Sequence, residues 1–488
     1  MNCFLTFDVG TTAMKCILFD ESLSELYSVS IEYSLQTQEG GFVELDAEIY
    51  YNTFCRCVKE LKASGIDINS VRSVTFTTQG ETLIPVDRDG NALCPAIIWL
   101  DSRAKEEAEY LKSKITCKQF YEKTGLCEIE PLLPAAKILW IYNNRKDIYD
   151  KTYKFLLLED YLILKLTGEF VSEKSLQSSS GWYEIKTEAF FDDMLNLCHI
   201  KKSHIPKIMS CGTKVAAVKP SVCEELGFCK DTYVVSGAMD QISSAIGIGN
   251  IREGMLTETT GTALVAGVTV ENPDFDYKNP ITVYKHYDGK FLYIPYIETA
   301  GMTLKWFNET VMPYAEMEGK KKNISSYEYI DELALKAPVG SGGIIMLPDL
   351  TDGGSFVGLS LSSTVGSMAR SVLEGVAYML EDIVASIEDK GIQVEEVYSL
   401  GGGSKSKLWC SIKADVINKN IVRVGYAQTT SRGAAVLAAV ADGIYKNVGE
   451  AVGRFRDENT AFIPKKENVE KYKEAYNKYQ KVKEGIAK

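Results

Sequence analysis

Short hydrophobic runs separated by polar turn residues open the chain, and this pattern predicts β-strands. The runs lie at Phe4–Asp8, Lys15–Phe19 and Tyr27–Leu35. Because only short turn-like segments separate them, we expect the strands to form a hairpin meander. A Rossmann-type domain would instead begin with a strand followed by a helix. The pattern therefore predicts a fold that begins with an antiparallel meander.

Apolar residues spaced three or four positions apart predict helices farther along the chain. One helix is expected near Ala47–Ala63, ahead of a strand at Val71–Thr77, and Ser102–Ser113 has the charge pattern of a solvated helix. A long helix is expected to begin at Ser367, with Gly391 where a C-terminal cap belongs. The mixture of strands and helices predicts an α/β protein.

A second hairpin is expected after the glycine-punctuated segment Gly247–Gly254. Its strands are Met255–Thr259 and Ala263–Val270. A Gly-Thr turn joins them, and a similar turn, Gly10-Thr11-Thr12, joins the strands of the first hairpin. We interpret this as a weak internal repeat, which predicts two domains built to one plan. The expected domains are residues 1–247 and 248–488.

The chain is acidic, with 54 Lys and Arg against 66 Asp and Glu and a formal net charge of −12. Because it lacks long basic runs, neither nucleic acid nor an anionic membrane is expected as a partner. No run of about 18 apolar residues predicts a membrane span, and the first residues do not resemble a signal sequence. The 12 scattered cysteines, without a CxxC pair, are typical of a cytoplasmic protein. Three histidines provide little material for a histidine metal site or a Ser-His-Asp triad.

The turn after the first strand could bind a phosphate. It reads Asp8-Val9-Gly10-Thr11-Thr12, and Lys15 follows three residues later. Backbone N–H groups in a tight glycine turn form a concave anion site, and threonine hydroxyls add donors. Asp8 at the strand end could hold Mg²⁺ through water. A plain hairpin turn also favours aspartate and glycine, so both interpretations stay open.

Two more polar turns could contact the same ligand. One is Thr259-Thr260-Gly261-Thr262 in the second hairpin, and the other is the GGGSKS run at Gly401–Ser406, between a strand at Val397–Leu400 and a helix. Glycines there permit close approach of a flat ligand, and a helix N-terminus favours anions. Each could also be an ordinary polar turn. The sequence contains no GxxxxGK[ST] pattern, so a P-loop enzyme is not the leading hypothesis.

Asp240 is the candidate general base. It follows a buried strand predicted at Thr232–Ser236, which runs into Gly237, and it precedes an apolar helical segment. A carboxylate in that place can accept the proton of an attacking hydroxyl. An aspartate before a helix is also a common N-cap, and the two roles are compatible.

Taken together and in order, these segments resemble the FGGY carbohydrate kinases, a branch of the sugar kinase, heat-shock chaperone and actin superfamily. The matching stretches are FLTFDVGTTAMKCILFD, GFVELDAEIYY, TTQGETLIPVDRDGNALCPAIIWLDSR, YVVSGAMDQ, ETTGTA, ARSVLEGVAYML and GGGSKSKLWCSIKADV. The resemblance implies two ribonuclease-H-like (actin-like ATPase) domains with a nucleotide and sugar cleft between them. It also implies a kinase that uses ATP and Mg²⁺ to phosphorylate a hydroxyl of a small sugar or polyol, and a homodimer as a family-level expectation.

The resemblance implies a role for each matched residue. Asp240 would be the general base and Asp8 the Mg²⁺ ligand. The residues implied to bind ATP and its phosphates are Gly10, Thr11, Thr12, Lys15, Gly261, Thr262, Gly402, Gly403 and Ser406. Those implied to bind the sugar are Gln79, Glu81, Trp99, Asp101, Asp240 and Gln241.

Departures from the family pattern bear on the substrate. Glycerol kinases resemble Asn-Gln-Arg-Glu-Thr where this chain has Gln79-Gly80-Glu81 after a threonine, and Leu132 replaces a tyrosine of the glycerol pocket. Losing two large side chains predicts a roomier pocket, hence a four- or five-carbon polyol or ketose such as xylulose. Xylulose kinases carry a Met-His-Gly-Gln run there, which this chain lacks, although its GGGSKSKLW and SGAMDQ segments look closer to that branch. Glycerol is the alternative substrate.

Two other classes of protein share parts of this pattern. A chaperone-like or actin-like ATPase would also have the two phosphate hairpins. Such a protein would lack the Trp99-Leu100-Asp101-Ser102-Arg103 segment and would need additional domains. A binding module that lost its activity is disfavoured because Asp8, Asp240 and both turns are present. ATP turnover measured with and without sugar separates the three.

Overall fold

The computed structural model describes residues 2–351, 353–456 and 458–486, and its contacts divide the chain into two compact units. Unit 1 consists of Met1–Ile251, Glu271–Leu292 and Gln428–Arg456. Unit 2 consists of Arg252–Val270, Tyr293–Ala427 and Asp457–Lys488. A segment late in the sequence therefore returns to unit 1. The boundary expected between residues 247 and 248 stays a prediction.

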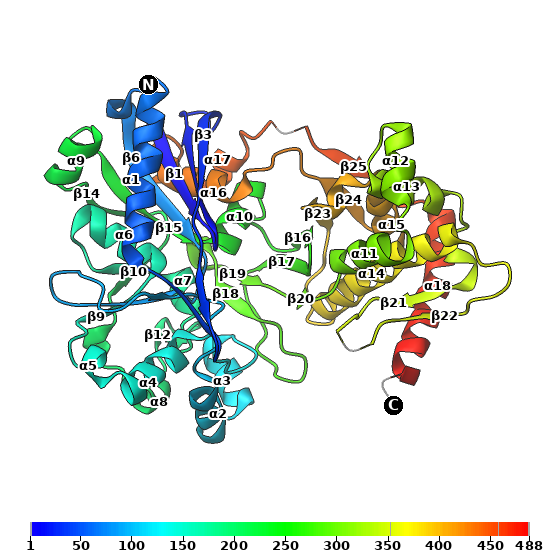
Figure 1. Ribbon diagram of the computed structural model, residues 1–488, viewed down its shortest axis with the longest axis horizontal. Helices are drawn as coiled ribbons and strands as arrows, with labels where there is room; N and C mark the ends of the chain where they lie inside the picture. The colour runs from blue at the N-terminus through cyan, green and yellow to red at the C-terminus, as the bar shows by residue number, and fades with distance from the viewer. Residues whose placement is uncertain (1, 352, 457, 487–488) are drawn as a thin grey trace. The chain divides into compact units, whose positions relative to one another are not determined.

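The main sheet of unit 1 contains the first predicted hairpin and the strand expected to follow it. Its strands follow the order β14-β15-β6-β1-β2-β3 (Figure 1). Strand β1 pairs antiparallel with β2 and parallel with β6, β15 pairs parallel with β6, and β14 is an antiparallel edge. The strands are β1 (Cys3–Val9), β2 (Ala13–Phe19), β3 (Glu25–Glu32), β6 (Val71–Thr78), β14 (Lys214–Ala217) and β15 (Tyr233–Met239). The expected meander is confirmed, and parallel strands continue the sheet beyond it.

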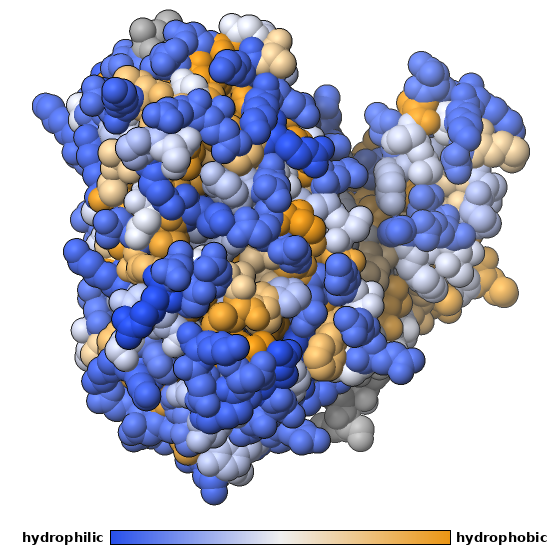
Figure 2. Space-filling model, turned by 60° about the vertical axis from the view of Figure 1, so that its left-hand side comes forward, coloured by the Kyte–Doolittle hydropathy of each residue, from blue (hydrophilic) through white to orange (hydrophobic). Residues whose placement is uncertain are grey.

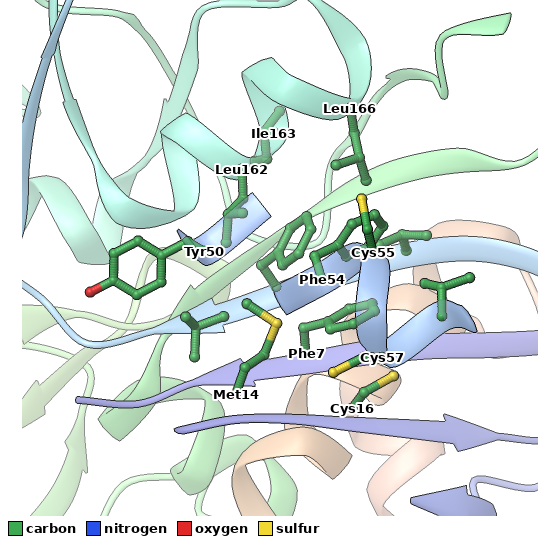
Figure 3. Packing of buried hydrophobic residues seen from close by; sticks show 14 of the residues in the cluster. Phe7, Met14, Cys16, Tyr50, Phe54, Cys55, Cys57, Leu162, Ile163 and Leu166 are labelled. Carbon is green, nitrogen blue, oxygen red and sulfur yellow. The ribbon is translucent and has the colours of Figure 1, made fainter. Parts of the chain in front are cut away.

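A hydrophobic core covers one face of this sheet under helices α1 (Ala47–Ala63) and α6 (Leu158–Thr167) (Figure 3). Phe7 of β1 contacts the rings of Phe54 and Phe76, with centroids 4.7 and 5.4 Å apart. Strand β1 is buried because its residues pack on both faces of the sheet, which explains why its sequence reads as a nearly continuous apolar run. This burial fixes the end of β1, where the candidate phosphate turn begins.

A smaller antiparallel sheet and several helices complete unit 1. The sheet has the order β4-β5-β8-β7-β9, with β4 (Gln36–Gln38), β5 (Phe42–Leu45), β8 (Ala96–Ile97), β7 (Leu83–Val86) and β9 (Lys154–Leu157). The helices include α2 (Lys105–Lys114), α3 (Cys117–Thr124), α4 (Pro134–Asn144), α5 (Lys146–Tyr149), α7 (Lys174–Ser178), α8 (Asp192–Leu197), α9 (Pro220–Leu226) and α10 (Asp240–Ile248). Shorter strands are β10 (Val171–Glu173), β11 (Tyr183–Glu184), β12 (Ala189–Phe190), β13 (Lys207–Met209) and β18 (Val283–Lys285).

The late segment of unit 1 packs helix α16 (Thr429–Asp442) against α10, beside the blue strands in Figure 1. The two backbones come unusually close. A Cβ atom on Gly247 would lie 1.8 Å from the Thr429 carbonyl oxygen, and one on Gly433 would lie 1.8 Å from that of Ser243. Only glycine permits this approach. Helix α17 (Val448–Val452) follows α16.

Unit 2 repeats the strand order of unit 1. Strand β16 pairs antiparallel with β17 and parallel with β23, β24 pairs parallel with β23, and β25 is an antiparallel edge. The strands are β16 (Met255–Thr260), β17 (Leu264–Val270), β23 (Glu396–Leu400), β24 (Asn420–Arg423) and β25 (Thr460–Phe462), and β20 (Tyr296–Ile297) pairs with β17. The succession of antiparallel, parallel, parallel and antiparallel pairs matches β2-β1-β6-β15-β14. This match confirms the predicted internal repeat.

Helices surround the sheet of unit 2. They are α11 (Gly301–Trp306), α12 (Ala315–Lys322), α13 (Ser326–Leu335), α14 (Val365–Glu388), α15 (Lys407–Ile417) and α18 (Lys466–Ile486), and a hairpin joins β21 (Ile345–Leu347) to β22 (Ser355–Val357). Tyr378 of α14 lies against the rings of Tyr472, Tyr476 and Tyr479 of α18. These aromatic contacts hold the two longest helices of the unit together.

Some expected boundaries move. The helix expected at Ser367 begins at Val365, because the Thr364 hydroxyl caps it by accepting the Ser367 N–H, and it ends at Glu388. Gly391 has a φ of +82° but lies beyond the helix end. Strand β15 does not end at Ser236 as predicted but continues through an irregularity in its pairing to Met239.

Within the described residues, no helix is both long and apolar enough to cross a membrane. Figure 2 shows hydrophilic residues over most of the face that it presents, with hydrophobic residues in small separate groups.

Candidate functional site

The turn between β1 and β2 is held from one side by Tyr33. The Tyr33 hydroxyl donates to the carbonyl oxygens of Gly10 at 2.5 Å and Ala13 at 3.2 Å, and its N–H donates to that of Thr12 at 2.9 Å. The Gly10 N–H closes the turn on Ala13 at 3.0 Å. Because three of its carbonyl groups are bound by Tyr33, the turn has a fixed shape. Thr12 at its tip is exposed.

Thr11 connects this turn to the segments expected to bind the sugar. Its hydroxyl accepts a hydrogen bond of 2.9 Å from the indole N–H of Trp99 and donates one of 2.9 Å to Oε1 of Gln79. The Gln79 amide in turn donates to the hydroxyl of Tyr50 at 3.5 Å. The structure therefore brings Thr11, Gln79 and Trp99 together. Both hydrogen bonds of the Thr11 hydroxyl are made to residues of unit 1. A direct contact of Thr11 with phosphate stays a prediction.

Asp240 is the first residue of α10, and the N-cap position belongs to Met239. The alternative role of Asp240 as the N-cap is therefore wrong. The Asp240 carboxylate accepts the N–H of Gln241 at 2.6 Å. Burial raises the pKa of Asp240 to about 7, the charges of Asp8 and Glu81 add to the rise, and the Gln241 N–H opposes it. A carboxyl group with this pKa can exchange a proton near neutral pH, which is what a general base requires.

Asp8 and Lys15 face each other across the β1–β2 ladder. Burial raises the pKa of Asp8, and the charge of Lys15 partly opposes this rise. The Lys15 ammonium donates to the side chain of Gln428 at 2.8 Å, and Gln428 precedes α16. The hairpin that carries the candidate phosphate turn is thereby tied to the late segment of unit 1.

Glu81 has a backbone conformation that is rare outside glycine, with a φ of +55°. The buried ammonium of Lys137 on α4 donates to the carbonyl oxygens of Glu81 and Ile98, both at 2.9 Å. Burial raises the pKa of Glu81 and lowers that of Lys137, while each charge opposes the shift of the other. Lys137 thus fixes the segment of Glu81 and the segment that leads to Trp99. The sequence does not indicate this role of Lys137, because a single lysine in a helix carries no local signal.

Asp101 differs from its expected role as a sugar ligand. It is fully buried, and its carboxylate accepts the N–H of Val43 at 2.6 Å and three hydrogen bonds from Arg103 at 2.7–3.0 Å. Arg103 also pairs with Glu44 at 2.7 Å. Because these partners occupy both carboxylate oxygens, Asp101 holds its segment in place, and we correct its assignment to a structural one.

Other residues near Asp240 shape the candidate sugar site. A Cβ atom on Gly80 would lie 3.2 Å from both the sulfur of Met239 and the hydroxyl of Ser179, so these side chains take up part of the room that an arginine would need. Burial raises the pKa of Tyr284 well above its usual value, and the charges of Glu81 and Asp240 add to the rise. Tyr284 therefore lies near both carboxylates, which the sequence did not indicate. Gln241 is exposed.

In unit 2 the turn between β16 and β17 rests on a buried ion pair. Lys413 of α15 donates at 2.7 Å to Glu258 and at 2.7 Å to the hydroxyl of Thr260, and both charged side chains are 0% exposed. Gly261 and Thr262 are exposed at the tip of the turn. A Cβ atom on Gly261 would meet no atom within 4 Å, so this glycine borders open space.

The glycine run after β23 has two environments. Gly402 is exposed, whereas Gly403 is buried and a Cβ atom on it would lie 2.7 Å from Cβ of Thr260. Ser406 caps α15, because its hydroxyl accepts the N–H of Trp409 at 2.9 Å. The structure thus brings Gly403 against the turn of the second hairpin. A contact of Ser406 with the nucleoside stays a prediction.

Models of one protein family match most of this chain. The N-terminal domain of the FGGY family of carbohydrate kinases matches residues 3–247, and its C-terminal domain matches residues 257–441. The chain belongs to the FGGY family of carbohydrate kinases. It is therefore a carbohydrate kinase and not a chaperone-like or actin-like ATPase.

Relatives of this FGGY kinase match it over almost its whole length. It is 26% identical to the xylulose kinase of Staphylococcus xylosus, over 97% of this chain and 98% of that one. It is 26% identical to the gluconokinase of Bacillus subtilis (strain 168), over 90% of this chain and 87% of that one. The crystal structure of ligand bound xylulose kinase from Lactobacillus acidophilus superposes with a TM-score of 0.90 at 25% identity, covering 100% of this chain and 99% of that one. The expected actin-like ATPase fold with two domains is confirmed.

Proposed function

We propose that this FGGY kinase transfers the γ-phosphoryl group of ATP to a hydroxyl of a small uncharged sugar or polyol, with xylulose or another five-carbon ketose as the main candidate. The observation that carries the proposal is the environment of Asp240. Its carboxyl group lies at the end of a strand, and its pKa is about 7 because it is buried and because the charges of Asp8 and Glu81 act on it. The full-length matches to xylulose kinases support the substrate.

In the proposed reaction the acceptor hydroxyl gives its proton to Asp240 while its oxygen attacks the γ-phosphorus. The new bond joins sugar oxygen to phosphorus, the bond from phosphorus to the bridging oxygen breaks, and ADP leaves. The N–H of Gln241 holds the Asp240 carboxylate in one orientation at 2.6 Å. Gln79, Glu81 and Trp99 would hold the other hydroxyl groups of the sugar.

Phosphate and nucleoside contacts are proposed for the two glycine–threonine turns and for the glycine run. In unit 1 these are Gly10, Thr11, Thr12 and Lys15; in unit 2 they are Gly261, Thr262, Gly402, Gly403 and Ser406. The exposed tips of both turns and the open space beside Gly261 support the assignment. Backbone N–H groups in such turns can stabilise the charge of a transferring phosphoryl group.

The residues present fit a Mg²⁺ ion held mainly by water and phosphate. The described residues contain no group of three or more His, Cys, Asp or Glu that could enclose a metal ion, and Mg²⁺ in kinases is commonly bound through only one or two carboxylates. Asp8 would hold the ion, because its buried carboxylate and that of Asp240 lie near enough to repel each other, and a cation would relieve this repulsion. The ion would neutralise charge on the phosphates.

The charge of the site favours an uncharged acceptor over gluconate, the anionic substrate named for a related kinase. The charges of Glu81, Asp240 and Glu130 all raise the pKa of Tyr284, so acidic groups predominate near this residue of unit 1. The nearby cation Lys137 donates to two backbone carbonyls, and its charge offsets that of Glu81 but is not among the charges that shift the pKa of Asp240. An added carboxylate would be repelled. Glycerol remains the second uncharged candidate, since Met239 and Ser179 reduce the room beside Gly80. A cytoplasmic location and a homodimer stay predictions.

An acceptor panel with purified full-length protein tests the proposal. ATP consumption is measured with xylulose, ribulose, erythritol, glycerol and gluconate, and Asp240→Ala is compared with wild type and with Asp192→Ala. Asp192 is likewise the first residue of a helix, but it is exposed and pairs with Lys202. We expect a five-carbon ketose to give the highest kcat/KM and Asp240→Ala to lower turnover by roughly two to four orders of magnitude. Wild-type turnover by folded Asp240→Ala rejects the base, and a preference for gluconate rejects the charge argument.

A further inference from the structure

The junction between β15 and α10, which presents Asp240, leaves the regular strand ladder. The pairing of β15 with β6 shifts between Val235 and Ala238. A Cβ atom on Gly237, inside this shift, would lie only 1.6 Å from the carbonyl oxygen of Phe76, so this position requires glycine. The Gly237 N–H donates to Oε1 of Glu159 on α6 at 2.6 Å. A side chain thus replaces the strand neighbour as the partner of this amide.

A second side chain holds the amide just before Asp240. The Met239 N–H donates to the hydroxyl of Ser175 at 2.9 Å, and this hydroxyl donates to Oε1 of Glu173 at 2.5 Å. Glu173 also accepts the N–H groups of Ser175 at 2.7 Å and Leu176 at 2.6 Å, which caps α7. The position of the Ser175 hydroxyl is therefore fixed by two elements, β10 and α7.

The carboxyl groups that make these contacts are buried, and burying a carboxyl group lowers the stability of the fold. Glu159 and Glu173 are at most 1% exposed, as is the neighbouring Asp160. Within the described residues they form no ion pair, and Lys174, next to Glu173, pairs instead with Glu188 at 2.6 Å. Burial raises the pKa of Glu159 and of Glu173, and their charges repel each other. Buried acids without a cation lower stability, so their presence calls for a compensating role.

We propose that Glu159 and the Ser175–Glu173 pair are positioning residues that hold the Gly237 and Met239 amides and thereby aim the carboxylate of Asp240 at the acceptor hydroxyl. This inference rests on the proposed role of Asp240 as the base. The carbonyl oxygen of an acid or an amide can accept the Gly237 N–H, so the role of Glu159 requires an acceptor and not a charge. An error of about 1 Å in the position of a reacting group can lower a rate by about 100-fold.

The tests compare variants that keep or remove each acceptor. Glu159→Gln keeps an amide oxygen for Gly237, and Glu159→Leu removes it. Ser175→Ala removes the hydroxyl that accepts the Met239 N–H, which leaves the Glu173 carboxylate as the neighbouring acceptor. Thr124→Ala is the matched control. The Thr124 hydroxyl is equally buried in unit 1 and accepts a backbone N–H, that of Leu126, at 3.2 Å.

For Ser175→Ala and Glu159→Leu we expect kcat to fall by roughly 10- to 100-fold while KM for sugar and for ATP changes by less than about threefold. Glu159→Gln should retain most of the wild-type kcat, and Thr124→Ala should leave kcat unchanged. An unchanged kcat in folded Ser175→Ala, or an equal loss in Thr124→Ala, overturns the proposal. If Glu159→Leu does not fold, Ser175→Ala alone decides.

Hydrogen exchange provides a measurement that does not depend on catalysis. The amides of Gly237 and Met239 should be protected in the wild type, and Ser175→Ala should lower the protection of Met239 selectively. Retained protection in Ser175→Ala overturns the positioning role. A wild type that shows this protection but no sugar-dependent turnover rejects the proposed function and not the hydrogen-bond network.

Discussion

The hydroxyl of Thr11 accepts a hydrogen bond of 2.9 Å from the indole N–H of Trp99, which joins the candidate phosphate turn to the candidate sugar segment. The two residues lie 88 positions apart in the sequence. The same hydroxyl donates to Gln79, so one threonine organises residues proposed to contact different substrates.

We expect Thr11→Val and Trp99→Phe to show coupled effects. Each should lower kcat/KM for the sugar, and the double variant should be little worse than the more damaging single variant. Residues in direct contact typically show coupling energies of about 0.5–3 kcal/mol. The measurement is a double-mutant cycle of kcat/KM. As a control, Trp182→Phe removes an indole N–H bonded to Gln177 at 3.0 Å and should combine additively with Thr11→Val. Additive behaviour of the Thr11 and Trp99 variants contradicts the prediction.

The rate should depend on pH through Asp240. The base acts when deprotonated, and its pKa in the free protein is about 7. We therefore expect kcat/KM for the sugar to fall about tenfold per pH unit below pH 7 and to level off above it. The test is a pH profile of kcat/KM, which reports the free enzyme. A rate that stays constant down to about pH 5 would falsify the assignment.

The free energy of unfolding should also depend on the Asp240 carboxyl group, but it should fall as pH rises, whereas the rate should increase. Its pKa is about 7 in the folded state against the usual 3.8, so between these values the folded state binds more protons than the unfolded state. The free energy of unfolding therefore falls as pH rises through this window. We expect Asp240→Asn to raise Tm relative to wild type at pH 8 and to have little effect below about pH 4. Equal effects at both pH values contradict the raised pKa.

Lys137→Met should weaken sugar binding selectively. It removes the two hydrogen bonds that hold the Glu81 and Ile98 carbonyls. A loss equivalent to one unsatisfied buried polar group, about 1–3 kcal/mol, would raise KM for the sugar by roughly 5- to 150-fold, and we expect little change in KM for ATP. Lys154→Met is the matched control, because Lys154 also donates to two backbone carbonyls, those of Ser203 and Ile205, at 2.8 Å each. Equal effects of the two variants on the sugar KM would refute a specific role of Lys137.

The close contact of α10 and α16 should not tolerate side chains. Gly433→Ala would place Cβ 1.8 Å from the Ser243 carbonyl oxygen and force the helices apart. Overpacking of this kind typically costs about 1–3 kcal/mol, which urea unfolding can measure. Gly485→Ala, in α18 with no atom within 4 Å of its Cβ, should be neutral or stabilise by about 0.5–1 kcal/mol. Similar effects of both variants would contradict the described contact.

Local sequence patterns predicted much of the fold correctly. The helix expected at Ala47–Ala63 has these bounds in the structure, and both hairpins form at the expected residues. These elements depend on the spacing of apolar residues and on short turns, which a linear sequence records directly. The strand that leads to Asp240 is predicted over Thr232–Ser236 but continues to Met239. The sequence does not show that Glu159, 78 residues from Gly237, accepts the amide of Gly237 and lets the strand continue.

The candidate site combines both kinds of information. By itself, the sequence determined the two glycine–threonine turns, the strand that precedes Asp240 and the resemblance to carbohydrate kinases. Only the tertiary structure decided that Asp101 is buried with Arg103, that Lys137 holds Glu81, and that Thr11 bonds to Trp99. Turns and periodic elements follow from neighbouring residues. The pKa of a carboxyl group and the partner of a buried amide instead depend on side chains that folding brings from distant positions.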